Sequence, residues 1–265
     1  MTPDPLVSVI LTTRDRPRLL SISLACYRHQ SYAKRELVVV DDGERYPVDE
    51  AAVAAAGGRL VRVVPGTPLG TKLNRGVEAA RGILCQKMDD DDWYASNFLE
   101  TQVATVLESW NVVCRPTLAF VTPFLFFDIA RWQIHRSIQN NVPGATFLFS
   151  RDTWEERPFR ALPRDEDVWF FLDRRKLDVA LVPVPHPDIF LAVRHRGSSL
   201  DRGHTWTHQG DGRILEDYIE SRPLHHQLPE SLLPDWALSA YRDLHGELAR
   251  GPGGSVQIAT ALSGN

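Results

Sequence analysis

Short apolar runs alternate with amphipathic segments through the first ninety residues of the chain. Four of these runs are β-branched or mostly apolar and are bounded by polar or glycine-containing turns: Val7–Thr13, Glu36–Gly43, Arg59–Val64 and Gly82–Met88. Runs of this length and composition are typical of buried strands. The pattern therefore predicts four strands in the N-terminal part of the chain.

The segments between these runs carry apolar residues at helical intervals. They predict helices at Leu19–Tyr27, Val48–Ala56 and Thr71–Arg81, and glycines stop the last two. Strands that alternate with helices at this spacing form parallel sheets of βαβ units. We therefore expect an α/β fold built on a mainly parallel sheet.

Polar side chains follow three of the predicted strands. They are Thr12–Arg16 after the first strand, Asp41-Asp42 after the second and Asp89–Asp92 after the fourth. Parallel strands end at a common edge of the sheet, where open α/β sheets bind their ligands. We expect these three groups to converge on one crevice.

Four consecutive aspartates, Asp89–Asp92, form the most unusual feature of the sequence. Like charges in a row are tolerated when they are solvated or when a cation neutralises them. One interpretation is an acidic turn that caps the helix predicted to begin near Ser96. The other is a divalent metal site that holds a phosphorylated ligand, and its position at the end of a buried strand favours this second interpretation.

The second half of the chain is less regular. Apolar runs predict strands at Ala145–Ser150, Leu177–Val184 and Ile189–Val193, and Pro163–Leu172 has the pattern of a helix start. Three acids fall in the first turn of that helix, where the macrodipole favours them. The pattern alone indicates a capped helix there. Leu215–Ala249 is helical with proline breaks.

Composition is that of an ordinary globular protein, with 43% hydrophobic and 24% charged residues in a chain of 265. The net charge of −4 gives no basic footprint for nucleic acid, so we expect no nucleic-acid partner. The apolar stretch Leu118–Ala130 is interrupted by Pro123 and Asp128, so no transmembrane segment is expected. Three cysteines without metal-ligand spacing, and no signal peptide, favour a reducing, cytoplasmic location. Peripheral attachment to a membrane and the oligomeric state stay open.

Several motifs occur in series at suitable spacing in the first hundred residues. Together they resemble the family two inverting glycosyltransferases of GT-A fold. The stretches that carry the resemblance are Val7–Arg16, Leu37–Gly43, Leu73–Gly82, Met88–Tyr94 and Phe98–Glu100.

The resemblance implies a Rossmann-like, mainly parallel sheet flanked by helices, a smaller sheet on the acceptor side and a helical C-terminal tail. Residues 1–110 would form the nucleotide-sugar-binding half of a single GT-A domain. Residues 111–214 would form the half that binds the acceptor and carries the catalytic base, and 215–265 a helical extension with a frayed end.

The resemblance also assigns roles within the acidic run. Asp91 corresponds to the metal ligand of the family's DxD motif, which holds Mn²⁺ or Mg²⁺ on the sugar-nucleotide diphosphate. Asp89 corresponds to the first acid of the motif, near the ribose. Asp90 is a candidate for sharing the sugar or ribose contact, and Asp92 remains a structural acid on the helix side.

The nucleotide base would lie against Thr12, Arg14 and Asp42 in this resemblance. Asp42 is suited to accept a hydrogen bond from a pyrimidine N3–H, and Arg14 to stack on the base, although Arg14 and Arg16 also fit a solvated turn. Lys72 is a candidate contact to a phosphate or the base; the alternative is an exposed helix lysine.

On the acceptor side, Phe147–Arg151 and the pair Glu166-Asp167 resemble the family's acceptor strand and late acidic pair. Inverting transfer needs a base that takes the proton from the acceptor hydroxyl. We assign that role to Asp167, and to Glu166 the orientation of the site or of the acceptor. Trp169 is a candidate to contact the acceptor. It belongs to a set of tryptophans that either stack on a sugar or aglycone or lie in the core: Trp132, Trp154, Trp169 and Trp206.

His195 lies in a segment that folds over the nucleotide in related enzymes, so it is a candidate ligand of the metal or contact to a phosphate. His204 is a rival for the same role. Arg194 and Arg196 offer charge to the diphosphate, or belong to a solvated loop.

The resemblance thus implies an inverting glycosyltransferase that moves a hexosyl or related group from a UDP- or dTDP-linked donor to a hydroxyl acceptor. The acceptor would be a saccharide, a natural product or a lipid-linked molecule. A nucleotidyltransferase would need a glycine-rich phosphate loop after the first strand, which Thr12–Arg16 is not. A catalytically silent sugar-nucleotide-binding domain should lack the metal or base acids, but Asp91 and Asp167 are both present.

Overall fold

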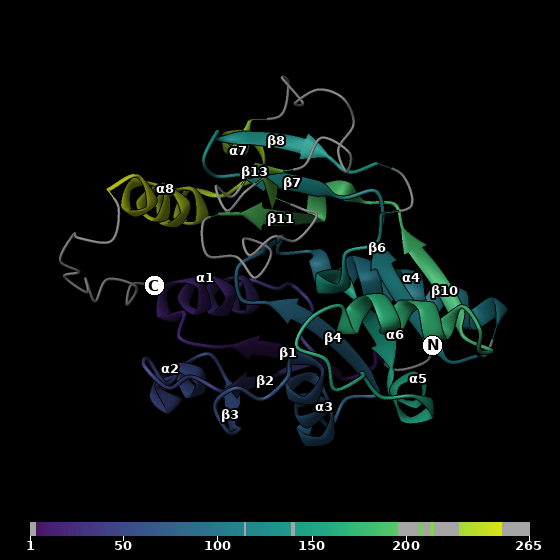
Figure 1. The fold of residues 1–265 in the computed structure, drawn as a ribbon. Coiled ribbons are helices and arrows are strands. Elements are labelled where there is room, and N and C mark those ends of the chain that lie inside the picture. The colour runs from purple at the N-terminus through teal and green to yellow at the C-terminus, as the bar shows by residue number, and fades with distance from the viewer. Residues whose placement is uncertain are drawn as a thin grey trace.

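A mixed seven-stranded sheet forms the centre of the computed structural model, which describes residues 4–113, 115–138, 141–195, 207–208, 213–214 and 228–250. The strands lie in the order β10-β6-β9-β4-β1-β2-β3 (Figure 1). Their bounds are β1 (Val7–Thr13), β2 (Arg35–Asp41), β3 (Gly58–Arg62), β4 (Leu84–Asp89), β6 (Thr117–Val121), β9 (Leu148–Ser150) and β10 (Ala180–Val184). Neighbouring strands are parallel except β9, which is antiparallel to both β4 and β6.

Helices cover both faces of this sheet. They are α1 (Pro17–Arg28), α2 (Glu50–Ala55), α3 (Leu69–Ala79), α4 (Phe98–Val112), α5 (Arg151–Glu156) and α6 (Glu166–Arg174). Alternate residues of β1 point to opposite faces: Val9 and Leu11 pack in one core cluster with α1, α2 and α4, whereas Ile10 packs in a second with α3 and α6. A strand buried on both faces is mostly apolar, which is why β1 is rich in β-branched and aliphatic residues, and its buried Ser8 donates a hydrogen bond to Glu36.

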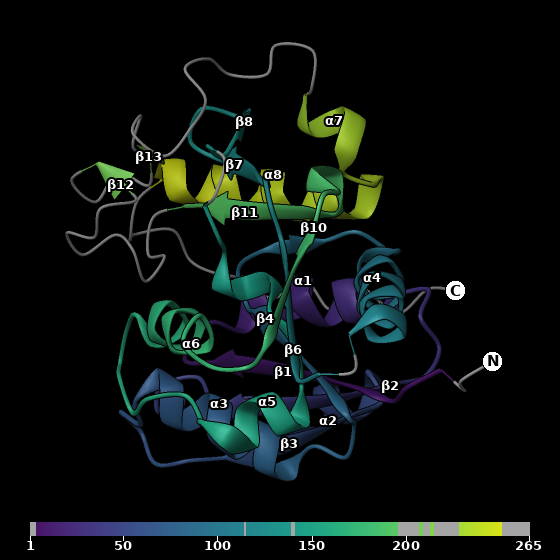
Figure 2. The same cartoon turned by 90° about the vertical axis from the view of Figure 1, so that its right-hand side faces the viewer.

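A smaller four-stranded sheet lies at one end of the large sheet in both views (Figures 1 and 2). Its strands are β5 (Trp93–Tyr94), β11 (Phe190–Arg194), β7 (Leu125–Asp128) and β8 (Gln133–Arg136), in that order. Two 3-10 turns, η1 (Gly144–Thr146) and η2 (Pro187–Ile189), and a short pair, β12 (Thr207–His208) with β13 (Arg213–Ile214), complete this part of the fold. The helices α7 (Pro229–Leu232) and α8 (Asp235–Arg250) flank it.

The α/β class, the mainly parallel sheet and the second, smaller sheet are confirmed. Two expected strands are shorter than predicted: 145–150 begins as the turn η1, and 177–184 becomes strand only at Ala180. The predicted helical segment 215–249 contains α7 and α8, and residues 215–227 lie outside the described part. Within the described ranges, no helix is both long and apolar enough to cross a bilayer.

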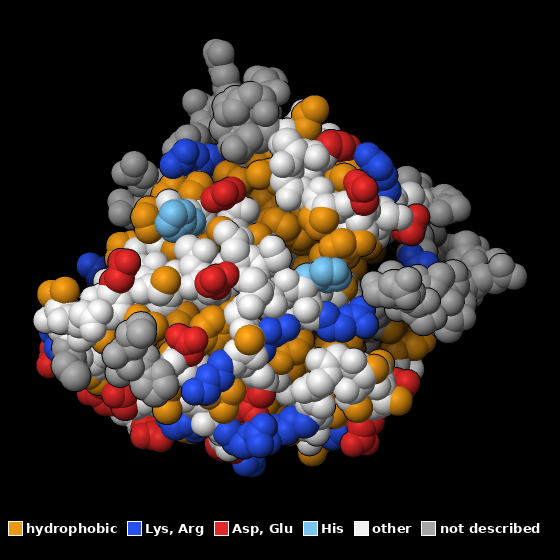
Figure 3. All heavy atoms as spheres, turned by 180° about the vertical axis from the view of Figure 1, so that it is seen from behind, with side chains coloured by type: hydrophobic (Ala, Val, Ile, Leu, Met, Phe, Trp, Pro, Cys, Tyr) orange, Lys and Arg blue, Asp and Glu red, His pale blue; other side chains and the backbone are white. Residues whose placement is uncertain are grey.

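The back face of the molecule carries Lys and Arg side chains interspersed with acidic and apolar ones (Figure 3). Several surface arginines of α3 and the neighbouring strands are paired with acids: Arg75 with Glu78, and Arg59 and Arg81 with Glu36. The Arg75–Glu78 pair is exposed on both sides and contributes little to stability, whereas Glu36 is buried beneath its two arginines.

Candidate active site

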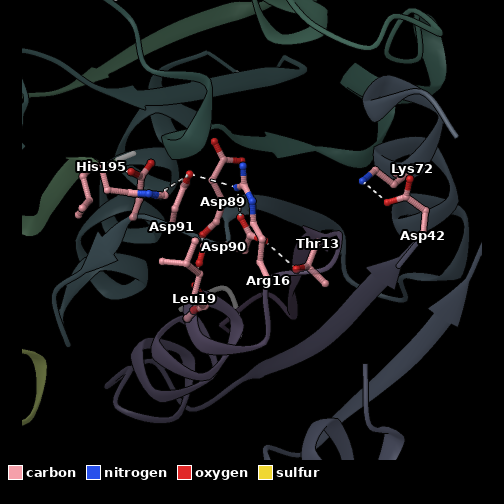
Figure 4. A network of polar contacts seen from close by, with 12 residues as sticks. Thr13, Arg16, Leu19, Asp42, Lys72, Asp89, Asp90, Asp91 and His195 are labelled. Atoms are coloured by element: carbon pink, nitrogen blue, oxygen red, sulfur yellow. Dashed lines mark hydrogen bonds and ion pairs between the residues drawn. The ribbon is translucent and has the colours of Figure 1, made fainter. Parts of the chain in front are cut away.

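The polar strand ends meet at the carboxyl edge of the large sheet, as the sequence predicts. Thr12 of β1 lies directly opposite Asp89 of β4, and Asp42 follows β2 on the other side of β1. Figure 4 shows the acidic run and the pair Asp42–Lys72 along this edge, with Arg16 and Thr13 drawn between them. The three groups therefore lie along one edge of the sheet.

The first two aspartates of the run are held by neighbours in the large sheet. Asp89 Oδ1 accepts a hydrogen bond from Lys87 Nζ at 2.7 Å. Asp90 accepts from Thr13 Oγ1 at 2.6 Å and from the guanidinium of Arg16 at 2.9 Å. Arg16 is thus a partner of the acidic run, not a solvated turn residue.

The last two aspartates of the run contact β11 and the residue that follows it. Asp91 Oδ2 lies 3.5 Å from His195 Nε2 and accepts a hydrogen bond from Arg16 at 3.2 Å. Asp92 Oδ1 accepts from the backbone N–H of Val193 at 2.8 Å. The run is therefore a buried hub of contacts, and a freely solvated acidic turn is not what the chain forms.

Burial and these partners set the ionisation of the carboxylates. Burial raises the pKa of Asp90 against the opposing charge of Arg16, and it raises the pKa of Asp92 well above its usual range. Burial also opposes ionisation of Asp91, but the contacts with His195 and Arg16 outweigh it and lower its pKa. These contacts favour the ionised form of Asp91, which is the form that a metal ligand needs.

The residues present fit a divalent cation that keeps part of its coordination for a substrate. Asp91 offers a carboxylate and His195 an imidazole nitrogen, 3.5 Å apart and both largely shielded from solvent. Among the described residues no group of three or more His, Cys, Asp or Glu side chains could by itself enclose an ion. Magnesium commonly uses one or two carboxylates and completes its shell with water and substrate phosphates, and manganese favours similar oxygen ligands.

A second charged pair lies beside the acidic run. Lys72 Nζ donates to Asp42 Oδ1 at 2.6 Å, and the backbone N–H of Gly66 donates to Asp42 Oδ2 at 3.2 Å. Arg14 Nε lies 3.9 Å from the same carboxylate. Lys72 is only 7% exposed, so the interpretation as an exposed helix lysine is wrong. Asp42, Arg14 and Lys72 thus form a charged cluster at the end of β2, and the role of this cluster toward a nucleotide base stays a prediction.

The neighbouring acid, Asp41, has a different task. Its carboxylate accepts hydrogen bonds from the backbone N–H groups of Gly43 and Val48 and from Arg62. These bonds fix the loop that follows β2. Asp41 is therefore structural, which leaves Asp42 as the acid of this pair that faces the site.

Lys87 is a site residue that the sequence interpretation missed. Its side chain is 3% exposed, and its ammonium group lies 2.7 Å from Asp89 and 3.9 Å from Glu166 Oε1. Burial alone would lower the pKa of this lysine, but Asp89, Glu166 and Asp167 raise it. A lysine inside a mostly apolar strand was the available signal, because a buried charge needs a partner.

Glu166 and Asp167 begin α6 in different surroundings. Glu166 is buried, and burial together with Asp167 raises its pKa to about 8 despite Lys87. Asp167 is half-buried, and its Oδ1 accepts from the backbone N–H of Val168 at 2.8 Å. A Cβ on Gly144 would lie 2.1 Å from Asp167 Oδ2, so this carboxylate packs on the bare backbone of η1.

The sequence left open whether the tryptophans contact a ligand or pack in the core, and the described ones differ in this respect. Trp169 is 39% exposed and lies under the guanidinium of Arg160, 4.0 Å from its carbon to the ring centroid. Trp154 and Trp132 donate their indole N–H groups to Asn74 and Glu230. Those two rings serve packing. Trp206, His204 and Arg196 lie outside the described residues.

Comparisons with known proteins agree with this geometry. The sequence profile of Glycosyl transferase family 2 matches residues 8–160. A search of curated proteins by sequence returned no match.

Solved structures share the fold at low sequence identity. TarS 1–349 from S. aureus in complex with UDP-GlcNAc has a TM-score of 0.56 at 14% identity, over 75% of this chain and 61% of that one. The chain thus spans about three fifths of that structure's length. The mannosyltransferase PcManGT from Pyrobaculum calidifontis, in complex with GDP-Man and Mn²⁺, has a TM-score of 0.54 at 18% identity, over 96% of this chain and 77% of that one.

The family profile covers more than half of the chain and includes the strand ends that carry the acidic run and Asp42. The two solved structures have the same mixed sheet architecture. The chain therefore belongs to glycosyl transferase family 2 and has the GT-A fold of a glycosyltransferase.

Proposed function

We propose that the protein is an inverting, metal-assisted glycosyltransferase that uses a nucleotide-diphosphate sugar. The position of Lys87 carries this proposal, because its ammonium group faces Asp89 of the donor-side run and Glu166 at the start of α6. The acids that we assign to the donor side and to the acceptor side thus both lie near this one ammonium group. A glycosyl group held between them would have its leaving diphosphate on one side and its acceptor on the other.

The carboxylate of Asp42 at the end of β2 is the basis for proposing a pyrimidine nucleotide. Asp42 has carboxylate oxygens that can accept the N3–H of uracil or thymine, while Lys72 and the N–H of Gly66 hold the carboxylate in place. The UDP-GlcNAc complex of TarS is in line with a UDP- or dTDP-linked donor. PcManGT, which has the same fold, was solved with GDP-Man, so the fold also accommodates a guanine nucleotide. The choice of a pyrimidine base therefore rests on Asp42 and its neighbours, not on the fold.

Asp91 and His195 would hold the divalent cation, whose chemistry there is to neutralise the charge that develops on the leaving diphosphate. Mn²⁺ in the PcManGT complex supports a cation at the corresponding place in the reaction. Asp89 and Asp90, fixed by Lys87 and by Thr13 with Arg16, would contact the ribose and the sugar.

Asp167 would act as the general base. It takes the proton of the acceptor hydroxyl while that oxygen bonds to the anomeric carbon, and the bond from this carbon to the diphosphate oxygen breaks on the opposite face. The electron pair leaves with the nucleotide diphosphate, and the configuration inverts without a covalent enzyme intermediate. Glu166 is less suited to accept a proton, because with a pKa of about 8 it already carries one at neutral pH. It can donate a hydrogen bond and orient the acceptor.

Thermal unfolding in the presence of nucleotides tests donor and metal together. We expect UDP or dTDP with Mn²⁺ to raise the Tm, by the equivalent of about 2.7 kcal/mol at a hundred times Kd, and EDTA to remove most of the increment. GDP serves as the comparison nucleotide. The proposal fails if no nucleoside diphosphate stabilises the protein with or without Mn²⁺.

The role of Asp167 is tested by Asp167→Asn, with metal-dependent hydrolysis of the nucleotide sugar as the assay and water as acceptor. We expect kcat to fall by about 10²- to 10⁴-fold while UDP and Mn²⁺ still bind. Asp178→Asn, a change at an exposed acid that pairs with Arg115, is the matched control and should leave kcat unchanged. Undiminished turnover in Asp167→Asn would reject this residue as the base.

A further inference from the structure

Asp92, the fourth aspartate of the run, contacts a strand that is far away in the sequence. Its Oδ1 accepts the hydrogen bond of Val193 N at 2.8 Å, across 101 positions. The side chain is buried, with 4% of its surface exposed. A carboxylate that is buried at this cost needs a reason to be there.

The strand register explains what this bond does. β5 and β11 pair antiparallel through Tyr94 with Phe190 and Trp93 with Leu191, and the ladder ends there. The Asp92 side chain then takes over as acceptor for the backbone of Val193. This hydrogen bond fixes the edge of β11 that faces β5 at a point beyond the last pair of the ladder.

The other edge of β11 is held by β7. Their parallel pairing runs to Arg194 opposite Asp128, and Ile129 N donates to Arg194 O at 3.1 Å. The end of β11 is therefore fixed from both sides. Among the described contacts at Val193, the bond from Asp92 ties this residue to a distant part of the chain, whereas the bond from Arg194 Nη1 to Val193 O is local.

His195 is the residue directly after β11. Its Nε2 lies 3.5 Å from Asp91 Oδ2, so two consecutive carboxylates, Asp91 and Asp92, contact residues two apart on one strand and its continuation. A shift of Val193 would carry His195 with it, because only one residue lies between them. The bond at Val193 thus limits where the imidazole can be.

We propose that Asp92 is a positioning residue that holds His195 beside Asp91 and so completes the pair of side chains that binds the divalent cation. This inference rests on the proposed function, in which Asp91 and His195 hold the metal. Asp92 does not itself contact the metal. It acts through the backbone of β11, and an acceptor oxygen at its position is what the role requires.

The test is the affinity for Mn²⁺ in the presence of UDP, measured by electron paramagnetic resonance of the free ion. Asp92→Ala is expected to weaken Mn²⁺ binding about 10- to 100-fold, the usual cost of losing a residue that orients a ligand. Asp92→Asn keeps an acceptor oxygen and should stay within about threefold of the wild type. Asp49→Ala is the matched control, because it also removes an aspartate that accepts from a backbone N–H, at the start of α2.

The double variant Asp92→Ala with His195→Ala separates positioning from a general loss of structure. If Asp92 acts through His195, this variant binds Mn²⁺ as His195→Ala alone does, since effects of residues that act as a unit are not additive. Full additivity would overturn the proposal, and so would unchanged Mn²⁺ affinity in Asp92→Ala. If Asp92→Ala does not fold, Asp92→Ser takes its place in the same comparison.

The outcomes for the two proposals are distinct. A wild-type protein that binds no Mn²⁺ with UDP rejects the metal-assisted function itself, and with it the role of Asp92. Tight Mn²⁺ binding in the wild type that Asp92→Ala leaves unchanged rejects only the role of Asp92.

Discussion

Each aspartate of the run Asp89–Asp92 has its own set of partners, although Arg16 is shared by Asp90 and Asp91. Lys87 holds the first, Thr13 and Arg16 the second, Arg16 and His195 the third, and the backbone of β11 the fourth. The sequence indicated that these charges needed compensation. The sequence did not show which residues provide this compensation. Contacts with His195 and Val193, about a hundred positions away, depend on how the strands are arranged in space, and local sequence patterns do not contain that information.

The site residues differ in how far they could be predicted. The edge position of Asp42 and the acidic run followed from the strand pattern alone. Lys72 was left undecided, because a lysine on a helix is usually exposed and only the tertiary contact with Asp42 buries it. Gly144 carried no signal at all, since its importance comes from the close approach of Asp167.

Gly144→Ala should therefore impair catalysis. The new Cβ would lie 2.1 Å from Asp167 Oδ2 and 2.3 Å from its Cβ, so the carboxylate or the turn has to move. We expect kcat for hydrolysis of the nucleotide sugar to fall by about 10²-fold, the cost of displacing a catalytic group by an ångström. Binding of UDP with Mn²⁺, which uses the other side of the site, should be retained. Wild-type turnover in this variant would show that Asp167 tolerates the shift or is not the base.

Glu166 predicts a pH dependence of stability. In the folded protein its pKa is raised from 4.5 to about 8, so between these values the native state holds a proton that the unfolded state has released. The free energy of unfolding therefore falls as pH rises through this window, by at most about 1.4 kcal/mol per pH unit from this group. Glu166→Gln removes the contribution and should give a shallower decline.

Urea denaturation at pH 5, 6.5 and 8 measures the effect as the difference in slope between the two proteins. Glu78→Gln, a change at an exposed acid paired with Arg75, is the control and should keep the wild-type slope. Identical slopes for wild type and Glu166→Gln would mean that Glu166 is charged throughout this range.

Local pattern located most elements of the N-terminal part. The bounds of β1 match those predicted, and β2, β3, β4 and α3 each begin and end within a few residues of their predicted bounds. Buried strands and amphipathic helices can be located in this way because each has a characteristic pattern of apolar residues. The direction of β9 could not be predicted in this way. An antiparallel strand between two parallel ones results from a choice among distant partners, and the same apolar run would suit either direction.

Helix α8 offers a test of packing at one residue. Tyr241 is fully buried, makes an edge contact with Phe127, and has a hydroxyl with no hydrogen-bond partner among the described residues. Tyr241→Ala should lower the free energy of unfolding by about 3–5 kcal/mol, as expected for removal of a large buried ring. Tyr241→Phe should be neutral or stabilising, because it removes a buried polar group without a partner.

Urea denaturation of both variants checks this prediction. Comparing the two variants separates the contribution of the ring to the free energy of unfolding from that of the hydroxyl, so each variant is the control of the other. A loss of more than about 1 kcal/mol in Tyr241→Phe would contradict the prediction and would point to a hydrogen bond of the hydroxyl outside the described residues.

The two sheets share one apolar core, in which residues of α1 and β1 belong to the same cluster as residues of β7, β11 and α8. We therefore expect the donor-side and acceptor-side parts to unfold together. Circular dichroism and tryptophan fluorescence should give coincident thermal transitions, as for a cooperative two-state unit. Two separated transitions would instead show that the halves 1–110 and 111–214 are independently stable.

Strand β9 has a consequence for how the chain is made. It fills the place between β4 and β6, and β4 has no other neighbour on that side. A ribosome releases β4 long before Leu148–Ser150, at about 5–20 residues per second. For several seconds the nascent sheet therefore presents an open edge that can pair with another chain. The interval before β9 arrives is thus the period in which this protein most needs protection from aggregation during synthesis.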